Sequence, residues 1–413
     1  MELYYSFSAL IVLASFFAYI NLRFLKLPST IGIMIIAMLT SILLVITGHI
    51  FPQTLSRFST LLQDVDFTEV LMGGMLNFLL FAGAIHINLK DLREQKVPIM
   101  IFSSVSVLIS TFAVGALLFY ALPFLGLEMS LIQCLLFGAL ISPTDPIAVL
   151  GILKNAHVPK SLETKVAGES LFNDGVAVVV FAVLLQISQG SAIDLSAWNI
   201  TWLLVKEAAG GFLLGFLLGL GASNAMRRID DYKVSVLITL SVVMGGYLIA
   251  RAMHISGPLT MVAAGIVIGN YGKRTAMSAT TKDYLNKFWE LIDDILNAIL
   301  FLFIGFELLL IPNILDYWLL GIVCIVIVLL SRFVSIWCPT LLIKFKERVT
   351  GGTIKILVWG GLRGGVSIAL ALSVDEGPHI QLIVAATYFV VVFSFIVQGM
   401  TIGKLANRVL PHE

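Results

Sequence analysis

The chain has 413 residues, of which 59% are hydrophobic and only 12% are charged, with a mean hydropathy of +1.00. A soluble domain carries about 25% charged residues, so this composition excludes a soluble globular protein and predicts a polytopic membrane protein. The formal net charge of +1 gives no reason to expect a nucleic-acid partner. The 3 cysteines lie in apolar stretches, so we expect reduced thiols that face lipid or the core and no disulfide framework. We also expect no cofactor.

Apolar stretches of about 20 residues match the thickness of a bilayer's hydrocarbon core. The first of them has no basic leader and no small-residue cleavage site, so we expect it to be retained as a membrane span. The sequence predicts an all-α polytopic membrane protein, one membrane domain over 1–413 without a separate soluble domain. The thirteen expected transmembrane helices are 3–22, 29–47, 69–87, 97–121, 129–153, 163–188, 199–224, 233–252, 256–270, 287–311, 316–342, 352–373 and 380–404.

The distribution of basic residues predicts the orientation of these spans. If the N-terminus lies outside, the inner connections and the C-terminal segment hold 21 of the 26 Lys and Arg residues. The outer loops then hold Arg57 and a set of acids. Because inner loops of membrane proteins are enriched in Lys and Arg, we expect the N-terminus outside and the C-terminus inside.

Two of the expected helices contain residues that interrupt a helix. The fifth contains ISPTDPIAVL, residues 141–150, and its two prolines each remove a backbone donor, so we expect the helix to open around Thr144 and Asp145. The twelfth contains WGGLRGGVS, residues 359–367, with four glycines around Arg363. Irregular backbone at membrane depth persists only where protein or a water-filled cavity satisfies it.

The positions of the two interruptions favour a transporter built from inverted repeats. They lie seven spans apart, so the two helices cross the membrane in opposite directions, and each is the middle member of a triplet of spans. Paired interruptions of this kind are a sequence indicator of a transport site. The alternative is that prolines and glycines only kink helices for packing, but here each interruption carries a charge.

Polar residues of the sixth span form the second part of the expected site. Asp174 lies eleven residues into it, about 16 Å along a helix and near the bilayer midplane. Glu169 and Asn173 share one helical face, and Ser170 and Asp174 share the next. If the fifth span packs alongside, Thr144 completes a group of hard oxygen ligands, which suits a small alkali cation.

A buried carboxylate becomes neutral by taking a proton or by taking a cation. If both compete for Asp174 and only occupied states cross, the protein exchanges protons for cations. The alternative is a structural anion paired with a buried arginine, either Arg332 or Arg363. Since there are three acids and two arginines, we expect Asp145 and Glu169 to be paired and Asp174 to be exchangeable.

The tenth expected span carries acids at both ends. Glu290, Asp293 and Asp294 lie at its inner end, where they either draw cations into a cytoplasmic funnel or form a solvated helix end. Both interpretations remain open from the sequence. Glu307 lies near the outer end, where we expect it to be solvated.

Four segments in this order, SPTDPIAVL, GESLFNDGVAVVVF, FWELIDDILNAILFLFIGFEL and WGGLRGGVSIALAL, resemble monovalent cation/proton antiporters of the NhaP-like branch, which includes the eukaryotic sodium/proton exchangers. The resemblance covers nearly the whole chain. It implies a thirteen-helix fold in which two unwound helices cross in a core subdomain (97–188 and 316–404). The remaining spans would form a homodimer, and transport would proceed by elevator-like alternating access.

The resemblance also implies roles for individual residues. Asp174 would bind the ion and the proton, with Ser170 and Thr144 as further ligands. The residues matching those that organise the unwound region are Asp145, Asn173, Glu169, Arg332 and Arg363. Asparagine before Asp174, in place of a second aspartate, resembles members that exchange one cation for one proton. The short segment after residue 404 indicates no tail-based regulation and a prokaryotic inner-membrane protein.

The expected activity is therefore exchange of a monovalent cation, Na⁺ first and also Li⁺ or K⁺, for a proton. One alternative is a sodium-coupled symporter of a small organic solute on a related fold. An intramembrane aspartyl protease using Asp145 and Asp174 is a second, although Phe-Asn precedes Asp174 where Gly-x-Gly would be expected. A cation channel is a third, but the sequence has no filter-like run of carbonyls.

Overall fold

The computed structural model describes residues 2–48, 67–145, 147–155, 158–189, 197–229, 231–309, 311, 314–343, 349–374 and 379–409. The described chain contains helices and no strand, so the all-α prediction is confirmed. The α-helices are α1 (Glu2–Ile20), α2 (Ser29–Gly48), α4 (Phe67–Val70), α5 (Leu76–Ile85), α6 (Leu89–Glu94), α7 (Lys96–Met100), α8 (Ser106–Ala121), α9 (Leu131–Ile141), α10 (Ile147–Asn155), α11 (Lys160–Ser188), α12 (Ala197–Met226), α13 (Tyr232–Ala252), α14 (Gly257–Val267), α15 (Lys273–Thr275), α16 (Ala279–Phe306), α17 (Trp318–Leu342), α18 (Gly351–Trp359), α19 (Gly365–Leu372), α20 (Ile380–Phe393) and α21 (Met400–Val409). Short π-helical or 3₁₀ segments join them at Asn21–Leu25, Leu71–Met75, Ile101–Val105, Leu122–Leu125, Ile268–Gly272, Glu307–Leu309, Ile314–Tyr317 and Ser394–Gly399.

In the described part of the chain, 8 helical stretches are long and apolar enough to cross a membrane by themselves. Each of the other five expected spans has a local reason to fall short. Two form short helices around α5 and α14, and two are divided into α9–α10 and α18–α19. The fifth is α16, which carries four acids and two lysines between Lys282 and Asp294 and so has no long uncharged window.

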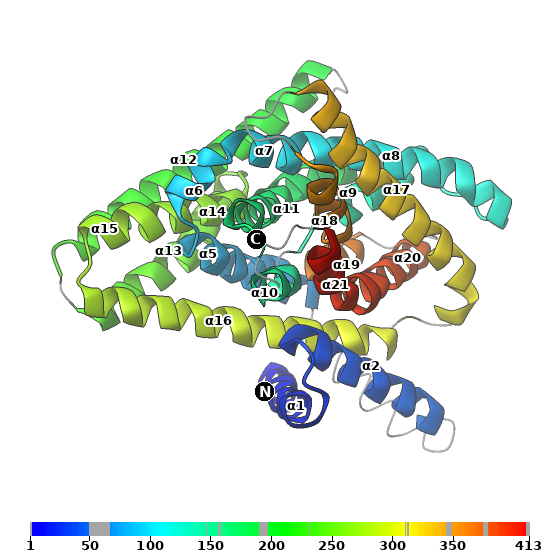
Figure 1. Cartoon of the computed structure of the whole chain (residues 1–413), viewed down its shortest axis with the longest axis horizontal. Coiled ribbons are helices and arrows are strands. Elements are labelled where there is room, and N and C mark those ends of the chain that lie inside the picture. Colours follow the sequence, from blue (N-terminus) through cyan, green and yellow to red (C-terminus); the bar gives the residue numbers. More distant parts are fainter. Residues whose placement is uncertain are drawn as a thin grey trace.

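Helix α16 organises the arrangement of the bundle. It runs along one side of the molecule, with α1 and α2 on its outer side and the remaining helices on the other (Figure 1). Helices α5, α12, α13 and α14 pack together at one end. At the other end α17 and α9 pack against α8, and α19 packs against α20.

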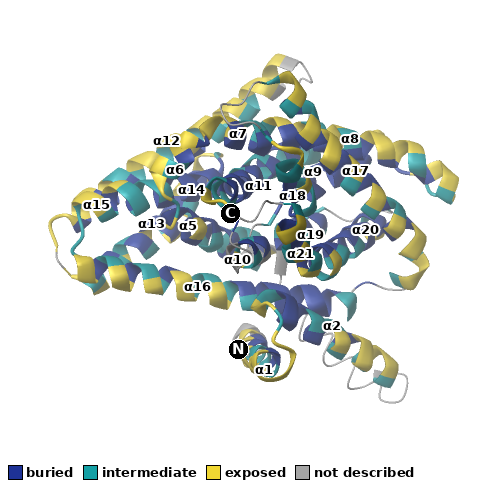
Figure 2. Ribbon diagram, in the orientation of Figure 1, coloured by how far each residue is buried: buried dark blue, intermediate teal, exposed yellow. Residues whose placement is uncertain are grey.

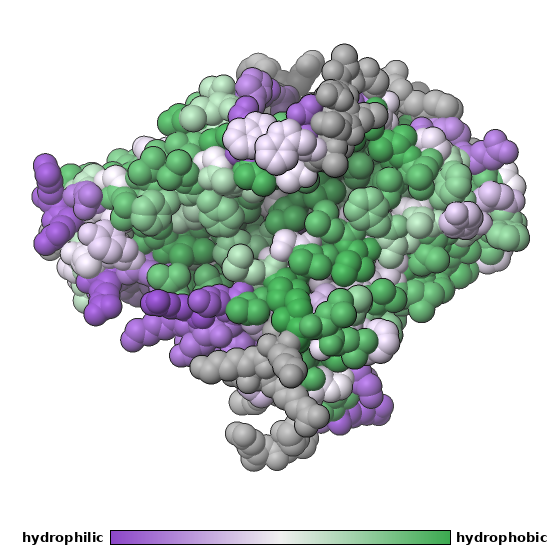
Figure 3. All heavy atoms as spheres, turned by 90° about the horizontal axis from the view of Figure 1, so that it is seen from above, coloured by the Kyte–Doolittle hydropathy of each residue, from purple (hydrophilic) through white to green (hydrophobic). Residues whose placement is uncertain are grey.

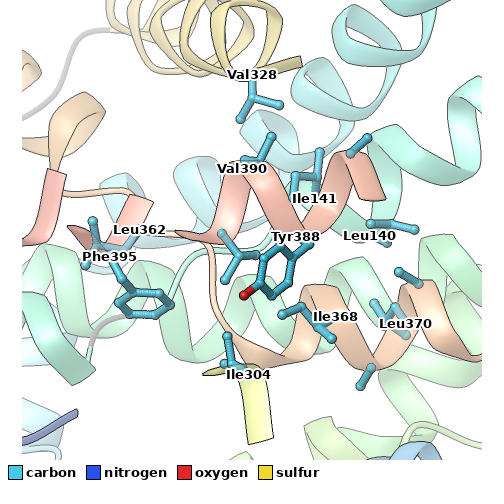
Figure 4. Packing of buried hydrophobic residues seen from close by; sticks show 14 of the residues in the cluster. Leu140, Ile141, Ile304, Val328, Leu362, Ile368, Leu370, Tyr388, Val390 and Phe395 are labelled. Carbon is cyan, nitrogen blue, oxygen red and sulfur yellow. The ribbon is translucent and has the colours of Figure 1, made fainter. Parts of the chain in front are cut away.

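The buried apolar side chains form two clusters. The larger cluster includes side chains of α9, α17, α19 and α20 and the last turns of α16, and Figure 4 shows Tyr388 of α20 between Ile141, Ile304 and Ile368. The smaller cluster includes α5, α13 and α14 together with Leu285 and Trp289 from the first half of α16. Burial is greatest where these helices meet at the centre of the bundle (Figure 2). Helix α16 therefore contributes to both clusters.

The outer surface is apolar over a wide area. Large hydrophobic side chains are exposed on the outer helices, among them Trp202 and Leu213 on α12 and Ile322 and Leu330 on α17. Figure 3 shows hydrophobic residues across the middle of one face, with hydrophilic residues gathered toward its margins. An exposed apolar surface of this extent marks contact with lipid in a protein whose helices span a membrane, and this agrees with a multi-pass membrane protein.

Candidate functional site

The first interruption separates α9 from α10. Helix α9 begins after a capping box, in which Ser130 and Gln133 each satisfy a backbone N–H of the other. It ends at Ile141, and the chain is non-helical from Ser142 to Asp145. Pro143 accounts for this end, because proline disfavours helical backbone in the residue before it and removes a donor. Pro146 lies outside the described residues.

The second interruption separates α18 from α19, and two of its glycines permit close approaches by charged side chains. A Cβ atom at Gly361 would lie 2.7 Å from Nε of Arg332. A Cβ atom at Gly364 would lie 2.6 Å from Oδ2 of Asp145. Any other residue would displace these groups, so the glycines allow the second interruption to contact the charges of the site.

Hydrogen bonds join the two interruptions. The backbone N–H of Asp145 donates to the Leu362 carbonyl at 2.7 Å. The guanidinium of Arg363, which is 2% exposed, donates from Nη1 to the Ser142 carbonyl and, at 3.1 Å, to the Pro143 carbonyl. These carbonyls follow the C-terminus of α9, where a helix attracts a cation. Arg363 therefore satisfies the open backbone of the first interruption, and it forms no ion pair with a carboxylate of the described residues.

Three polar side chains connect the first interruption to α11. Asn173 is fully buried, and its Nδ2 donates to Oγ1 of Thr144 at 2.8 Å. Its Oδ1 accepts from the backbone N–H of Thr144 at 3.4 Å. The hydroxyls of Thr144 and Ser170 share a hydrogen bond of 3.0 Å. The amide of Asn173 thus holds Thr144 in place beside Ser170.

Glu169 forms the buried ion pair of the site. Its carboxylate lies 2.6 Å from Nη1 of Arg332 on α17, and the two side chains are 2% and 6% exposed. Nη2 of Arg332 also donates to the Leu357 carbonyl of α18 at 3.1 Å. Arg332 therefore links α11, α17 and α18, and it neutralises Glu169.

Asp174 lies one helical turn beyond Ser170 on α11 and is 8% exposed. Within the residues that the structure describes, its carboxylate makes no ion pair and accepts no hydrogen bond. It lines a cavity of about 460 Å³ together with Thr144, Asp145 and Ser170. The structure thus brings the expected ligands to one cavity and leaves one carboxylate there without a counter-charge.

The same cavity is lined by the acids of α16 and by an apolar wall. Glu290, Asp293 and Asp294 all border it. From the sequence these acids could have formed either a cytoplasmic funnel or a solvated helix end, and the structure places them in the same cavity as Asp174. Leu80 and Gly83 of α5 contribute to the apolar part of the lining. Because Leu80 belongs to the smaller apolar cluster and Leu300 to the larger, the cavity lies where the two clusters meet.

The expectation that Glu307 is solvated is wrong. Glu307 is 2% exposed, and its Oε2 has no hydrogen-bond partner in the described structure. It lies in the run ILFLFIGFELLLI, residues 299–311, and the apolar residues on both sides of it could have indicated its burial. Two further buried polar residues, Ser367 in the cavity lining and Asn297 one turn beyond Asp293 on α16, have no role predicted from the sequence.

Comparisons with known proteins agree with this geometry. Residues 11–408 match the family model described as the transmembrane sodium/hydrogen exchanger. The chain is 48% identical over 412 residues to the Na⁺/H⁺ antiporter NhaP of Pseudomonas aeruginosa, covering 97% of this chain and 96% of that protein. It is 34% identical to the Na⁺/H⁺ antiporter NhaH of Halobacillus aidingensis over 382 residues, covering 89% of this chain and 91% of the relative.

The fold is also that of a solved antiporter. The structure of the sodium proton antiporter MjNhaP1 from Methanocaldococcus jannaschii matches with a TM-score of 0.79 at 20% identity, covering 100% of both chains. At this identity the match establishes the fold, and the sequence relatives establish the family. Since those relatives are transporters, the intramembrane protease alternative is excluded. This chain belongs to the sodium/hydrogen exchanger family, in its NhaP-like branch.

Proposed function

We propose that this chain exchanges a monovalent alkali cation for a proton, with both bound in turn by Asp174. The observation that carries the proposal is a buried carboxylate that lines a cavity beside two hydroxyls and has no counter-charge among the described residues. The relatives named above are Na⁺/H⁺ antiporters, which makes Na⁺ the first candidate, with Li⁺ and K⁺ as further ones. The antiporter relatives disfavour both the solute symporter and the channel.

The chemistry of the site favours competition between the two substrates. An isolated carboxylate in a low-dielectric site is unstable as a bare anion, so it takes up a proton or a cation. Ser170 and Thr144 would supply neutral oxygen ligands beside Asp174, which suits a hard monovalent ion. If only the neutralised site crosses the membrane, each crossing in one direction carries a cation and each return carries a proton.

We further propose that one proton is exchanged for one cation, without net charge movement. The residue before Asp174 is Asn173, whose amide is bonded to Thr144. Glu169 is neutralised by Arg332. Asp145 would act as an organising residue, since its backbone and carboxylate lie against Leu362 and Gly364 of the second interruption. One titrating carboxylate remains, and one proton balances one monovalent cation.

The proposed architecture has thirteen spans in an inverted repeat whose two interrupted helices cross at the site. The core subdomain would comprise 97–188 and 316–404, and the remaining spans would form a homodimer in the inner cell membrane, with the N-terminus outside. The cavity is lined by Asp174 and Ser367 of the proposed core and by Leu80 and Asp293 of the remaining spans, which supports a boundary there along which one part could slide past the other. Glu290, Asp293 and Asp294 would attract cations to the inner opening.

The test of the exchange function uses purified protein in liposomes. Adding Na⁺, Li⁺ or K⁺ outside should dissipate a preset pH gradient, read with a trapped pH-sensitive dye. Asp174→Asn should abolish this signal while its melting temperature stays near that of the wild type. The matched control is Asp316→Asn, which changes an exposed acid outside the cavity and should retain exchange. Full exchange by Asp174→Asn would remove Asp174 from the mechanism.

A further inference from the structure

A second polar feature of the cavity lies on the α16 wall, away from α11. Asp293 and Leu300 both line the cavity. Asn297 follows Asp293 by four residues and precedes Leu300 by three, so it projects from the same face of α16. Asn297 is 2% exposed and lies where α16 passes from the smaller apolar cluster to the larger.

The Asn297 amide has unsatisfied hydrogen-bonding capacity. In the described structure neither Nδ2 nor Oδ1 meets a partner at hydrogen-bonding geometry. The amide nevertheless lies beside the Asp293 carboxylate, one turn away. Leaving a buried polar group without a partner costs about 1–3 kcal/mol, and the other buried amide of the cavity region, Asn173, is bonded on both atoms. Among the described residues, Asn297 therefore has no well-formed hydrogen bond, although the Asp293 carboxylate lies next to it.

A further oxygen is available from α19. Ser367 lines the same cavity, is fully buried, and its Oγ has no partner among the described residues. Helix α19 begins in contact with α16, because a Cβ atom at Gly365 would lie 2.4 Å from the Leu300 side chain. A carboxylate and a hydroxyl thus border one cavity near the contact between α16 and α19, and the Asn297 amide lies beside that carboxylate. Oxygen atoms of these three kinds are the ligands that alkali cations prefer.

We propose that Asp293 and Asn297 form a second, weaker alkali-cation site on the α16 wall, which holds the cation before it reaches Asp174. This inference rests on the proposed exchange function. The Asp293 carboxylate would supply the charge, the Asn297 Oδ1 would supply a neutral ligand, and Ser367 could complete the set. The second site raises the local cation concentration at the cavity and takes no part in proton exchange.

The experiment measures binding of radioactive ²²Na⁺ to the purified full-length protein at alkaline pH. Asp174→Asn should lose the tighter component and keep a weaker one, and Asp174→Asn combined with Asn297→Leu should lose both. Leucine is close to asparagine in size and cannot ligate a cation. In liposomes, Asn297→Leu alone should raise the KM for Na⁺ by about fivefold, as expected for one lost polar interaction, with the maximal rate retained.

Two further variants keep the test decisive. Asn286→Leu makes the same change on α16 about three turns before Asn297 and should leave Na⁺ binding unaltered. Asn297→Asp, which adds a carboxylate, should tighten the weaker component even if Asn297→Leu fails to fold. The inference is overturned if Asp174→Asn binds no Na⁺. It is also overturned if adding Asn297→Leu to Asp174→Asn leaves the remaining Na⁺ binding unchanged. If Asp174→Asn binds and exchanges Na⁺ as the wild type does, the proposed function is overturned instead. The effect of Asn297→Leu on Na⁺ binding would still decide whether the second site exists.

Discussion

The buried pair of Glu169 and Arg332 offers a quantitative test of the way charge is distributed in this site. Arg332→Met removes the guanidinium and leaves the Glu169 carboxylate, 2% exposed, without its partner at 2.6 Å. Removing one member of a buried ion pair costs about 3–5 kcal/mol. The change also removes the hydrogen bond to the Leu357 carbonyl, so α11, α17 and α18 lose a shared contact.

The assay is thermal unfolding of the detergent-solubilised protein, followed by the loss of the monodisperse peak in size-exclusion chromatography. We expect Arg332→Met to melt several degrees below the wild type, and Glu169→Gln with Arg332→Met to recover most of the loss, because the double variant leaves no unpaired charge. Coupling between the two changes, measured as a double-mutant cycle, should be large. If Arg332→Met is as stable as the wild type, then Glu169 is not held as an anion by Arg332, and the assignment of Asp174 as the sole exchangeable carboxylate fails with it.

Three other outcomes are expected. An imposed membrane potential should leave the initial rate of exchange almost unchanged, because one proton balances one cation; a rate that depends strongly on voltage would refute one-for-one exchange. Gly364→Ala would place a Cβ atom 2.6 Å from the Asp145 carboxylate and should abolish exchange in the liposome assay. The control is Gly351→Ala, whose Cβ atom would meet nothing within 4 Å and which should exchange normally. Equal activity of the two variants would contradict the close approach of Gly364 to Asp145. Burial lowers the pKa of Lys273, which donates to the Ile85 carbonyl, to about 8. Between pH 8 and the ordinary lysine pKa of about 10.4 the unfolded chain therefore binds more protons than the folded protein, so stability should rise with pH in this range. Lys273→Gln should flatten the corresponding rise in melting temperature, and an unchanged slope would exclude Lys273 as its source.

Features with a local chemical cause could be predicted from the sequence. The end of α9 follows from Pro143, and the gap between α18 and α19 follows from the glycines around Arg363. Charge counting predicted an arginine partner for Glu169, which Arg332 supplies, but it also assigned Arg363 to an acid, whereas Arg363 donates to the Ser142 and Pro143 carbonyls. Each of these inferences uses only the residue itself and the energetic cost of placing it in an apolar environment.

Features that depend on tertiary distance could not be predicted. Arg363 was one of two possible partners for a carboxylate, and its contact with the Ser142 and Pro143 carbonyls depends on how closely the two interruptions approach. The contribution of α5 to the cavity wall leaves no trace in the sequence, because Leu80 and Gly83 are ordinary residues of an apolar helix. The unsatisfied amide of Asn297 likewise becomes visible only when the partners of each buried atom are known.

The arrangement of fixed partners explains how an exchange site can remain both rigid and available. Arg363 is bound to backbone carbonyls, Glu169 is bound to Arg332, and Asn173 is bound to Thr144. Each of these contacts satisfies a group that would otherwise be costly to bury, and together they hold the open backbone of the first interruption in one geometry. Asp174 receives no such contact from the described residues, so the free energy of binding a proton or a cation there is not offset by breaking an existing pair. A guanidinium placed beside Asp174 would remove that advantage, and the site would then bind neither substrate well.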